Sequence, residues 1–577
     1  MRIHLHNVTT RFFAGALFCG FACTGAVAQS GWTTTATHAV TLSNATDLGP
    51  LSGATPIHVT LALQLQNASA LKQLVQSQNT PGNPLYETTL GPGQFMSTYA
   101  PTSAQVQAVS RYLSSFGFTN IQPEPNNLLI GADGTVAGAD AAFNTSLEQY
   151  DWNGRTVFAN TSAAQVPASF SSTVVAVLGL NSVNQVSVLQ FPVCGMPPAS
   201  IGCVGNSLPP QGFQKAYDVG NTPTGAKTTI AIFTFGGVPG VANDLRNAEI
   251  ANHLPQIPVV TKQIGVVNPT DLGAEEWEMD TQMSTGMAGS VKTLYLYTVT
   301  EADDADIALM FNHFVTDNEA RAGSASFGEC EYGPYLDGTM LATDEILLQG
   351  AAQGQTVFAS SGDSGSGCGV GLPNGVPASG PPMVEWPASS EYVVAVGGTS
   401  MTVNSDDSYN TEIAWNAGGG GISQFEPCSF WQSAASVASC QDNSRGVPDV
   451  AMNADPNFTG ATLYYGCTGV SDPSSCVDPG YGGTSLSSPL ALGVWARLLS
   501  ATNNKLGYAG PHLYQFYKQN EDVGNPNSLD PGFHDIILGA NGVYTAGYGY
   551  DLTTGLGTFD VAKFYALACS TDKNCSK

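Results

Sequence analysis

The pattern of hydrophobic and polar positions changes near residue 190 of the chain. Before that point, residues 58–65 (HVTLALQL) alternate apolar and polar side chains, whereas residues 103–116 (SAQVQAVSRYLSSF) repeat apolar side chains at helical spacing. Alternation is typical of a half-buried strand, and the longer period is typical of an amphipathic helix. The mixture predicts a small α+β domain over residues 29–190.

Beyond residue 213, continuous apolar runs alternate with periodic segments. The runs are residues 227–235, 293–299 and 355–360, and the periodic segments are residues 243–253, 307–315 and 344–354. Buried strands that alternate with helices predict an α/β fold, in which a parallel sheet carries helices on both faces. In such sheets functional groups gather on loops at the carboxyl ends of strands, so candidate functional residues are expected there.

A linker separates these two regions, and an export signal precedes them. Residues 191–212 (FPVCGMPPASIGCVGNSLPPQG) are rich in Pro, Gly and Cys, a composition that disfavours regular structure and is easily cleaved. At the N-terminus, basic residues precede the apolar run FFAGALFCGFA, and Ala26-Val-Ala28 supplies a cleavage site. We therefore expect a signal peptide over residues 1–28 and a secreted mature protein.

Composition narrows the classes of partner. The chain has 18 Lys and Arg against 45 Asp and Glu, a formal net charge of −27, which argues against nucleic acid or an anionic membrane as a partner. Charged residues are only 11% of the chain, so few native ion pairs would be lost when carboxylates protonate, which suits an acidic medium. Beyond the signal, the sequence offers no uninterrupted apolar run of about 20 residues that would span a bilayer.

Ten cysteines remain after the signal, and an even number in an exported chain favours disulfides. The sequence does not fix their connectivity, and zinc is not expected because CxxC pairs are absent. The simplest expectation pairs nearest neighbours: Cys194–Cys203, Cys330–Cys368, Cys428–Cys440, Cys467–Cys476 and Cys569–Cys575.

The stretch GGTSLSSP, residues 482–489, places serines where a glycine-rich loop turns into an apolar helix, a common setting for a nucleophile. A serine hydroxyl needs a positioned proton acceptor, usually histidine. The histidines beyond the linker stand in no setting typical of a catalytic base, and we interpret them as structural: His253, His313, His512 and His534.

Two segments contain carboxyl groups that could serve as the missing proton acceptor or as an acid. Glu276 and Asp280 lie four apart on one face of a predicted helix, where two carboxyls tend to share a proton and titrate as a unit. A solvated helix face is the alternative, which Trp277 and Met279 beside them disfavour. Asp363, in the turn SSGDSG after the strand 355–360, either caps the turn or, when protonated, donates a hydrogen bond to a developing oxyanion.

Together these motifs resemble the sedolisin family of serine-carboxyl peptidases over nearly the whole chain. The family's G-T-S-x-x-x-P motif is present from Gly483 to Pro489 and identifies Ser485, rather than Ser487 or Ser488, as the nucleophile. The family's E-x-x-x-D helix and S-G-D-x-G turn imply the remaining roles, with Glu276 as general base, Asp280 as its orienting partner and Asp363 as the oxyanion-hole acid.

The resemblance also implies an architecture and an activity. A ferredoxin-like propeptide over residues 29–190 precedes the activation cut in residues 191–212, and a subtilisin-like catalytic domain occupies residues 213–577. The implied enzyme is a secreted, acid-active endopeptidase that hydrolyses peptide bonds of proteins and peptides through an acyl-enzyme. It processes itself, is inhibited and assisted in folding by its own propeptide, and is expected to act as a monomer without nucleic-acid or membrane partners.

A fourth resemblance near the C-terminus implies one structural calcium ion. Calcium takes about six to eight oxygen ligands from carboxylates, carbonyls and water. The residues HDIILG from His534 and TAGYGYD from Thr545 match the family's calcium loop. The implied ligands are carboxylates or backbone carbonyls of Asp535, Ile536, Gly547, Gly549 and Asp551.

The chain departs from the family at two positions. Phe327 stands where tryptophan is common in an S-x-S-W-G stretch, and Thr234 occupies the place of an additional carboxylate found in some members, so an extended carboxylate relay is not expected. Three alternatives are weaker: a histidine-based subtilisin lacks a placed histidine, a non-catalytic calcium-binding or adhesion protein would not need the triad, and an aspartic peptidase would need duplicated Asp-Thr/Ser-Gly motifs.

Overall fold

The computed structural model describes residues 31–40, 42, 44–188, 206–368, 381–435, 440, 442–469, 473–518, 532–571 and 575. The expected signal peptide, most of the expected linker, and the cysteines Cys194 and Cys203 lie outside these residues. The division of the chain at residues 28, 190 and 212 therefore stays a prediction.

The N-terminal unit has the predicted α+β character. Its antiparallel sheet has the order β4-β5-β3-β9, and the helices α3 and α4 share one hydrophobic core with it. The bounds are β3 (Pro56–Leu63), α3 (Ser103–Ser115), β4 (Thr119–Pro123), β5 (Leu129–Thr135), α4 (Val136–Phe143) and β9 (Val174–Leu178). A second sheet joins β2 (Thr46–Pro50), β6 (Leu147–Trp152) and β7 (Arg155–Asn160).

The C-terminal unit, called the catalytic unit below because it contains the residues predicted to be catalytic, is built on a larger sheet with the order β13-β14-β12-β15-β17-β19-β20, and β23 also pairs with β19. All pairs are parallel except β19 with β20. The bounds are β12 (Gly225–Phe235), β13 (Val259–Gln263), β14 (Val291–Val299), β15 (Ala322–Ala325), β17 (Thr356–Ser360), β19 (Val393–Val403), β20 (Tyr409–Ala414) and β23 (Val450–Asn453).

Helices cover both faces of this sheet, as predicted. Successive strand residues point to opposite faces, and the consecutive residues Ile230 to Phe233 of β12 are all fully buried. Phe233 meets Phe311 and Phe314 of α8 edge to face, while α12 packs on β12 and against α7. The bounds are α6 (Val241–Ala251), α7 (Ala274–Ala288), α8 (Asp304–Asp317), α9 (Tyr332–Asp337), α10 (Thr339–Ala352), α12 (Thr484–Ala501), α13 (Ala509–Lys518) and α14 (Val561–Thr571).

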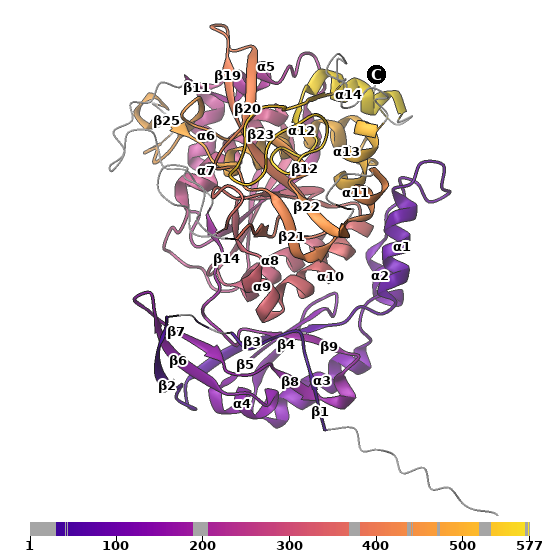
Figure 1. The fold of residues 1–577 in the computed structure, drawn as a ribbon, viewed down its shortest axis with the longest axis vertical. Helices are drawn as coiled ribbons and strands as arrows, with labels where there is room; N and C mark the ends of the chain where they lie inside the picture. The colour runs from indigo at the N-terminus through magenta and orange to yellow at the C-terminus, as the bar shows by residue number, and fades with distance from the viewer. Residues whose placement is uncertain are drawn as a thin grey trace, which may run out of the picture.

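The two units contact each other along one side of the catalytic unit. Figure 1 shows the N-terminal unit at one end of the molecule, with α1 (Ala68–Gln78) and α2 (Pro92–Thr98) reaching along the catalytic unit. After β9, the chain enters the catalytic unit as the short strand β10 (Ser187–Val188), which pairs antiparallel with β16 (Phe327–Cys330). The end of the N-terminal unit is thus already part of a catalytic-unit sheet.

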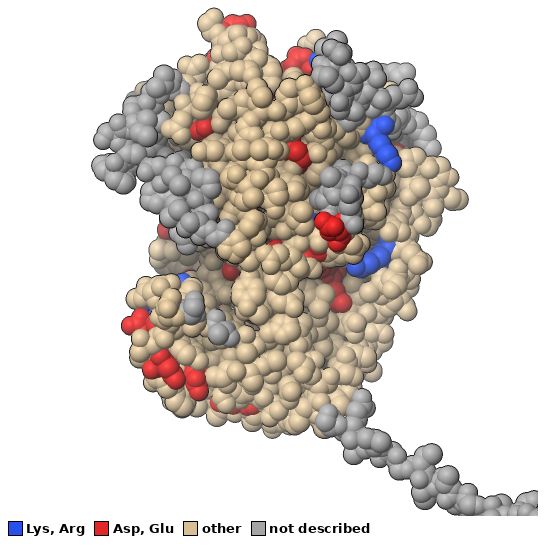
Figure 2. All heavy atoms as spheres, viewed as in Figure 1, with Lys and Arg blue, Asp and Glu red and all other residues tan. Residues whose placement is uncertain are grey.

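Four of the five expected disulfides are present: Cys330–Cys368, Cys428–Cys440, Cys467–Cys476 and Cys569–Cys575. Charged side chains are sparse on the face that Figure 2 shows, in line with their low share of the sequence. Within the described ranges, no helix is both long and apolar enough to cross a membrane.

Candidate active site

Ser485 is the second residue of α12, a helix that is buried along its whole length. Its sequence, TSLSSPLALGVWARLLSA, is small or apolar on every side, which is typical of a helix inside a large core. Gly483 precedes it with φ of 100°, a backbone conformation that a side chain would strain. The Ser485 hydroxyl donates to the carbonyl oxygen of Ser326 at 3.3 Å.

Glu276 and Asp280 lie on α7, which packs closely along α12. The close approach depends on Gly493 of α12, because a Cβ there would lie 2.6 Å from the Met287 Cβ. Both carboxyl residues are fully buried, as are Trp277 and Met279. The solvated helix face that the sequence left open is therefore wrong for this segment.

The surroundings of Glu276 favour its protonated form. Burial is the largest effect and, with the charge of Asp280, raises the pKa of Glu276 well above its usual range. The hydroxyls of Ser485 and Ser326 partly oppose this by lowering the pKa. In the described part of the chain neither Glu276 oxygen has a well-aligned hydrogen bond, so these hydroxyls act as neighbours rather than as fixed donors.

Asp280 is held by a serine that the sequence did not single out. The Ser326 hydroxyl donates to Asp280 Oδ1 at 2.5 Å and to the Ser485 carbonyl at 3.3 Å. Burial raises the pKa of Asp280 well above its usual range, and the Ser326 hydroxyl lowers it in part. Ser326 thus touches both the proposed nucleophile and the proposed orienting carboxyl. The only signal in the sequence was its place in the stretch SASFG.

Asp363 follows β17 in a tight turn and contacts the start of α12. The turn depends on Gly362, whose φ is 115°. Asp363 Oδ1 accepts hydrogen bonds from the Thr484 amide and hydroxyl, both at 2.8 Å, while Oδ2 is buried and has no partner among the described residues. Burial raises the pKa of Asp363 to about 7, against the lowering effect of Thr484. Asp363 therefore keeps its proton in acid and presents one carboxyl oxygen that no described residue uses.

The other residues that the sequence singled out do not enter the hydrogen bonds of this cluster that are described above. His512 is buried in the core, where burial lowers its pKa to about 4, and His534 stacks on Tyr409. The Thr234 hydroxyl donates to the Tyr297 carbonyl at 3.3 Å, and Phe327 packs edge-on against Phe235.

The C-terminal loop brings its two predicted carboxylates into one hydrogen-bonded network. Gly549 donates to Asp535 Oδ2 at 3.0 Å and Gly547 donates to Asp551 Oδ2 at 2.9 Å. No backbone or side-chain donor of the described chain uses the carbonyls of Ile536, Gly547 or Gly549. A group of three or more His, Cys, Asp or Glu side chains that could hold a metal does not occur within the described residues.

Both parts of the chain match known protein families. Residues 43–183 match the family described as Pro-kumamolisin, activation domain, and residues 270–529 match the Subtilase family. Sedolisin of Pseudomonas sp. (strain 101) is 38% identical over 548 residues, which cover 91% of this chain and 89% of that protein.

Further relatives and a solved structure agree with this match. Xanthomonalisin of Xanthomonas sp. (strain T-22) is 34% identical over 89% of this chain and 65% of its own length. Kumamolisin of Bacillus sp. (strain MN-32) is 28% identical over 89% of this chain and 92% of its own length. The structure of Pseudomonas sedolisin complexed with pseudo-iodotyrostatin aligns with a TM-score of 0.56 and 34% identity, covering 64% of this chain and 99% of that one.

Proposed function

The chain belongs to the sedolisin family as a serine-carboxyl peptidase with a propeptide activation domain, and we propose that it is a secreted, acid-active, self-processing endopeptidase. The observation that carries this proposal is the burial of three carboxyl groups, Glu276, Asp280 and Asp363, next to Ser485 and its neighbours Ser326 and Thr484. The Ser485 hydroxyl donates to the Ser326 carbonyl, and Asp280 accepts a hydrogen bond from the Ser326 hydroxyl. Asp363 accepts a hydrogen bond from the amide of Thr484, the residue that precedes Ser485. No described histidine joins this cluster, which disfavours a histidine-based mechanism.

In the proposed reaction, the Ser485 oxygen attacks the carbonyl carbon of a peptide bond while Glu276 takes the hydroxyl proton. Asp280, fixed by Ser326, holds Glu276 in place and shares its proton. Glu276 then returns a proton to the leaving amine, and water releases the acyl group by the reverse sequence. The acceptor is the form of the pair that holds a single proton, because two protonated carboxyls could not take up another. In that form the raised pKa values support this role, since a carboxylate of ordinary pKa is a weak acceptor for a hydroxyl proton.

Asp363 is proposed to stabilise the negative oxygen of the tetrahedral intermediate. A carboxyl group donates a hydrogen bond only while it is protonated, and burial keeps the pKa of Asp363 at about 7. Donation is therefore available below neutral pH and is lost as the pH rises through about 7. Acid activity follows from the requirement for this proton.

The path of the chain supports a self-processing zymogen. Ser187 pairs with Gly328 and Val188 pairs with Phe327, next to Ser326, whose carbonyl accepts the Ser485 hydroxyl. The end of the N-terminal unit thus pairs with the strand that directly follows Ser326, the residue that contacts Ser485. We propose that the first cut falls in the linker that follows this strand, residues 191–212, and that it is intramolecular.

One structural calcium ion is proposed for the C-terminal loop. The oxygens fit this ion, since two carboxylates and three carbonyls are hard ligands on one glycine-rich loop. Asp535 and Asp551 would supply carboxylate oxygens, and Ile536, Gly547 and Gly549 would supply carbonyl oxygens. The ion would tie this loop together, and it takes no part in the proposed reaction.

The test is acid incubation of the purified full chain beside a Ser485→Ala variant at several protein concentrations. We expect the unsubstituted chain to shorten at a rate that does not depend on protein concentration, and the product to have its N-terminus beyond Val188. The product should degrade denatured protein at about pH 3 to 5, near the carboxyl pKa values. The variant should stay intact. Processing or full peptidase activity in the variant would refute the assignment of Ser485.

A further inference from the structure

A cavity of about 400 Å³ lies between the N-terminal unit and the catalytic unit, away from the Ser485 cluster. Its walls come from both units: Leu65, Ala68 and Lys72 belong to the N-terminal side, and α9, α10 and β21 (Gly421–Pro427) belong to the catalytic side. Its size lies within the range of about 300 to 1,000 Å³ that is usual for small-molecule sites. The cavity exists only while the two units are docked.

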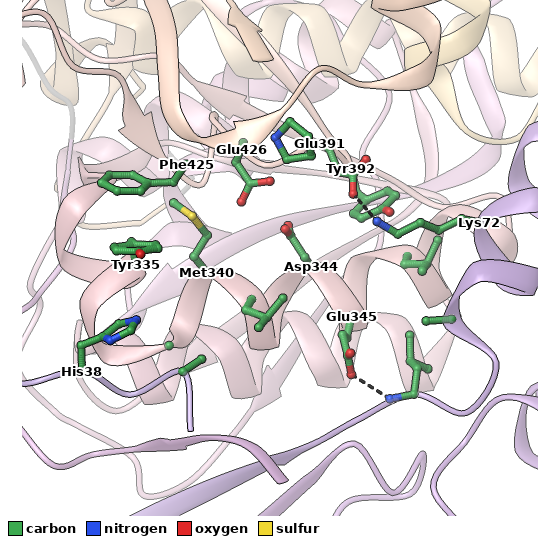
Figure 3. Close-up of a pocket in the computed structure, with 17 residues that line it drawn as sticks. His38, Lys72, Tyr335, Met340, Asp344, Glu345, Glu391, Tyr392, Phe425 and Glu426 are labelled. Carbon is green, nitrogen blue, oxygen red and sulfur yellow. Dashed lines mark hydrogen bonds and ion pairs between the residues drawn. The ribbon is translucent and has the colours of Figure 1, made fainter. Parts of the chain in front are cut away.

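One end of the cavity is aromatic and apolar. Phe425 stacks on Tyr335 with ring centres 4.0 Å apart, and the His38 ring lies over Tyr335 at 5.4 Å. Met340 lies between this stack and Asp344, with the sulfur end of its side chain toward Phe425, as Figure 3 shows. This end offers a surface for a flat or apolar group.

The other end carries four carboxyl groups and one lysine. Lys72 pairs with Glu391 at 2.7 Å, and Glu345 accepts the Leu65 amide at 2.8 Å. Asp344 accepts the Ser390 hydroxyl at 2.6 Å. These bonds give three of the four carboxyls a partner, and only one partner carries a positive charge.

Glu426 is the carboxyl whose side-chain partner is a second acid. It is only 5% exposed, and its carboxyl points into the cavity toward Asp344 in Figure 3. Its carboxyl hydrogen-bonds with the carboxyl of Asp344, a bond that requires a proton on one of the two acids, and the described residues supply no N–H donor to the Glu426 side chain. The charged groups facing it are Asp344 of α10, Glu391 before β19, Glu331 before α9 and, more distant, Lys72 of α1. A buried carboxyl in this position calls for either a proton or a cation.

We propose that this cavity binds a small organic cation with an apolar body, whose ammonium or amidinium group lies between Asp344 and Glu426 and whose apolar part packs on Met340 and the Tyr335–Phe425 stack. Because both units form the walls, such a ligand stabilises the docked zymogen by binding to it alone. Its release accompanies the separation of the propeptide.

Protons compete with this ligand. Burial raises the pKa of Asp344 to about 7 and, with the charge of Asp344, raises the pKa of Glu426 well above its usual range. A bound cation favours the ionised carboxyls, so its binding releases protons and weakens as the pH falls. An alkylammonium group titrates near about 10 and keeps its charge throughout. The cavity therefore holds a cation best at neutral or higher pH and gives it up in acid.

The experiment uses the full-length Ser485→Ala chain, with its intact mass checked, and 2-phenylethylamine as probe in titration calorimetry at pH 8 and pH 5. We expect one site at pH 8, binding weaker by at least about tenfold at pH 5, and no binding of the uncharged analogue 2-phenylethanol. Asp344→Asn with Glu426→Gln should remove binding, whereas the exposed control Asp406→Asn should not change it.

Lys72→Met supplies a readout that a loss of folding cannot imitate. It removes the one positive charge near the two acids, so the amine should bind more tightly than to the parent chain. Equal binding of the alcohol, unchanged binding in the double variant, weaker binding in Lys72→Met, or no amine binding at millimolar concentration would each overturn the proposal. None of these outcomes depends on whether Ser485 is the nucleophile.

Discussion

Replacing Asp363 by Asn separates hydrogen-bond donation from titration at the proposed oxyanion site. Asp363 Oδ1 accepts the Thr484 amide and hydroxyl, and the Asn carbonyl oxygen can accept both in the same place. The Asn amide nitrogen then takes the position of Oδ2, which has no partner among the described residues. An amide donates at every pH, whereas the carboxyl donates only below its pKa of about 7.

The expected magnitudes follow from this single group. Above a pKa of about 7, the protonated fraction of Asp363 falls about tenfold per pH unit. Because half of Asp363 is still protonated at pH 7, activity of the unsubstituted enzyme should fall roughly fivefold between pH 7 and 8 and approach the tenfold limit only at higher pH. Activity of Asp363→Asn should fall less, so the ratio of variant to parent rises by roughly fivefold between pH 7 and 8. Asp363→Ala lacks a donor and should lose about 100- to 1,000-fold in kcat at all pH values.

The assay is kcat/KM on a quenched fluorescent peptide from pH 3 to 9, with processed enzyme and with Asp406→Asn as an exposed control. Any fall in kcat/KM with pH that the parent and Asp363→Asn share is assigned to the titration of the Glu276–Asp280 pair. If Asp363→Asn and the parent have the same profile, Asp363 does not control the alkaline limb and the oxyanion assignment loses its main support.

Three further predictions concern the surroundings of the site and the stability of the fold. Ser326→Ala removes a hydrogen bond to Asp280, worth about 1.5–3 kcal/mol for a charged partner, and should lower kcat roughly 10- to 100-fold with little change in KM; an unchanged kcat would exclude a positioning role. Arg445→Met leaves the fully buried carboxylate of Asp449 without its ion pair and should cost about 3–5 kcal/mol in urea unfolding at pH 7, a loss that Arg445→Met with Asp449→Leu should partly restore. Chelation should lower the melting temperature of the unsubstituted chain but not that of Asp551→Asn, and equal shifts in both would remove the calcium proposal.

Local patterns were enough to predict the main elements of the fold. The apolar runs at 227–235, 293–299 and 355–360 correspond to β12, β14 and β17, because strands buried on both faces are apolar without a break. Boundaries were less accurate. α8 begins earlier than residue 307, because the Asp303 side chain accepts the Asp306 amide at 3.0 Å and caps the helix there.

Local patterns did not predict the contacts between segments that are distant in the sequence. Ser326 and Asp280 are 46 residues apart, and their hydrogen bond depends on how α7, α12 and the strand before β16 pack together. The pairing of Val188 with Phe327 likewise joins the two units and has no local signature. The cavity around Glu426 forms only where the N-terminal unit docks on the catalytic unit. The sequence of either unit alone therefore gives no sign of it.

The complete enclosure of α12 also has a dynamic consequence. Every one of its 18 residues is buried, so its backbone amides exchange with solvent deuterium only when the surrounding sheet and helices open together. Ser485, the proposed nucleophile, therefore lies at the edge of a segment with slow exchange. Isotope labelling of α12 would then report on the cooperative opening of the whole catalytic unit.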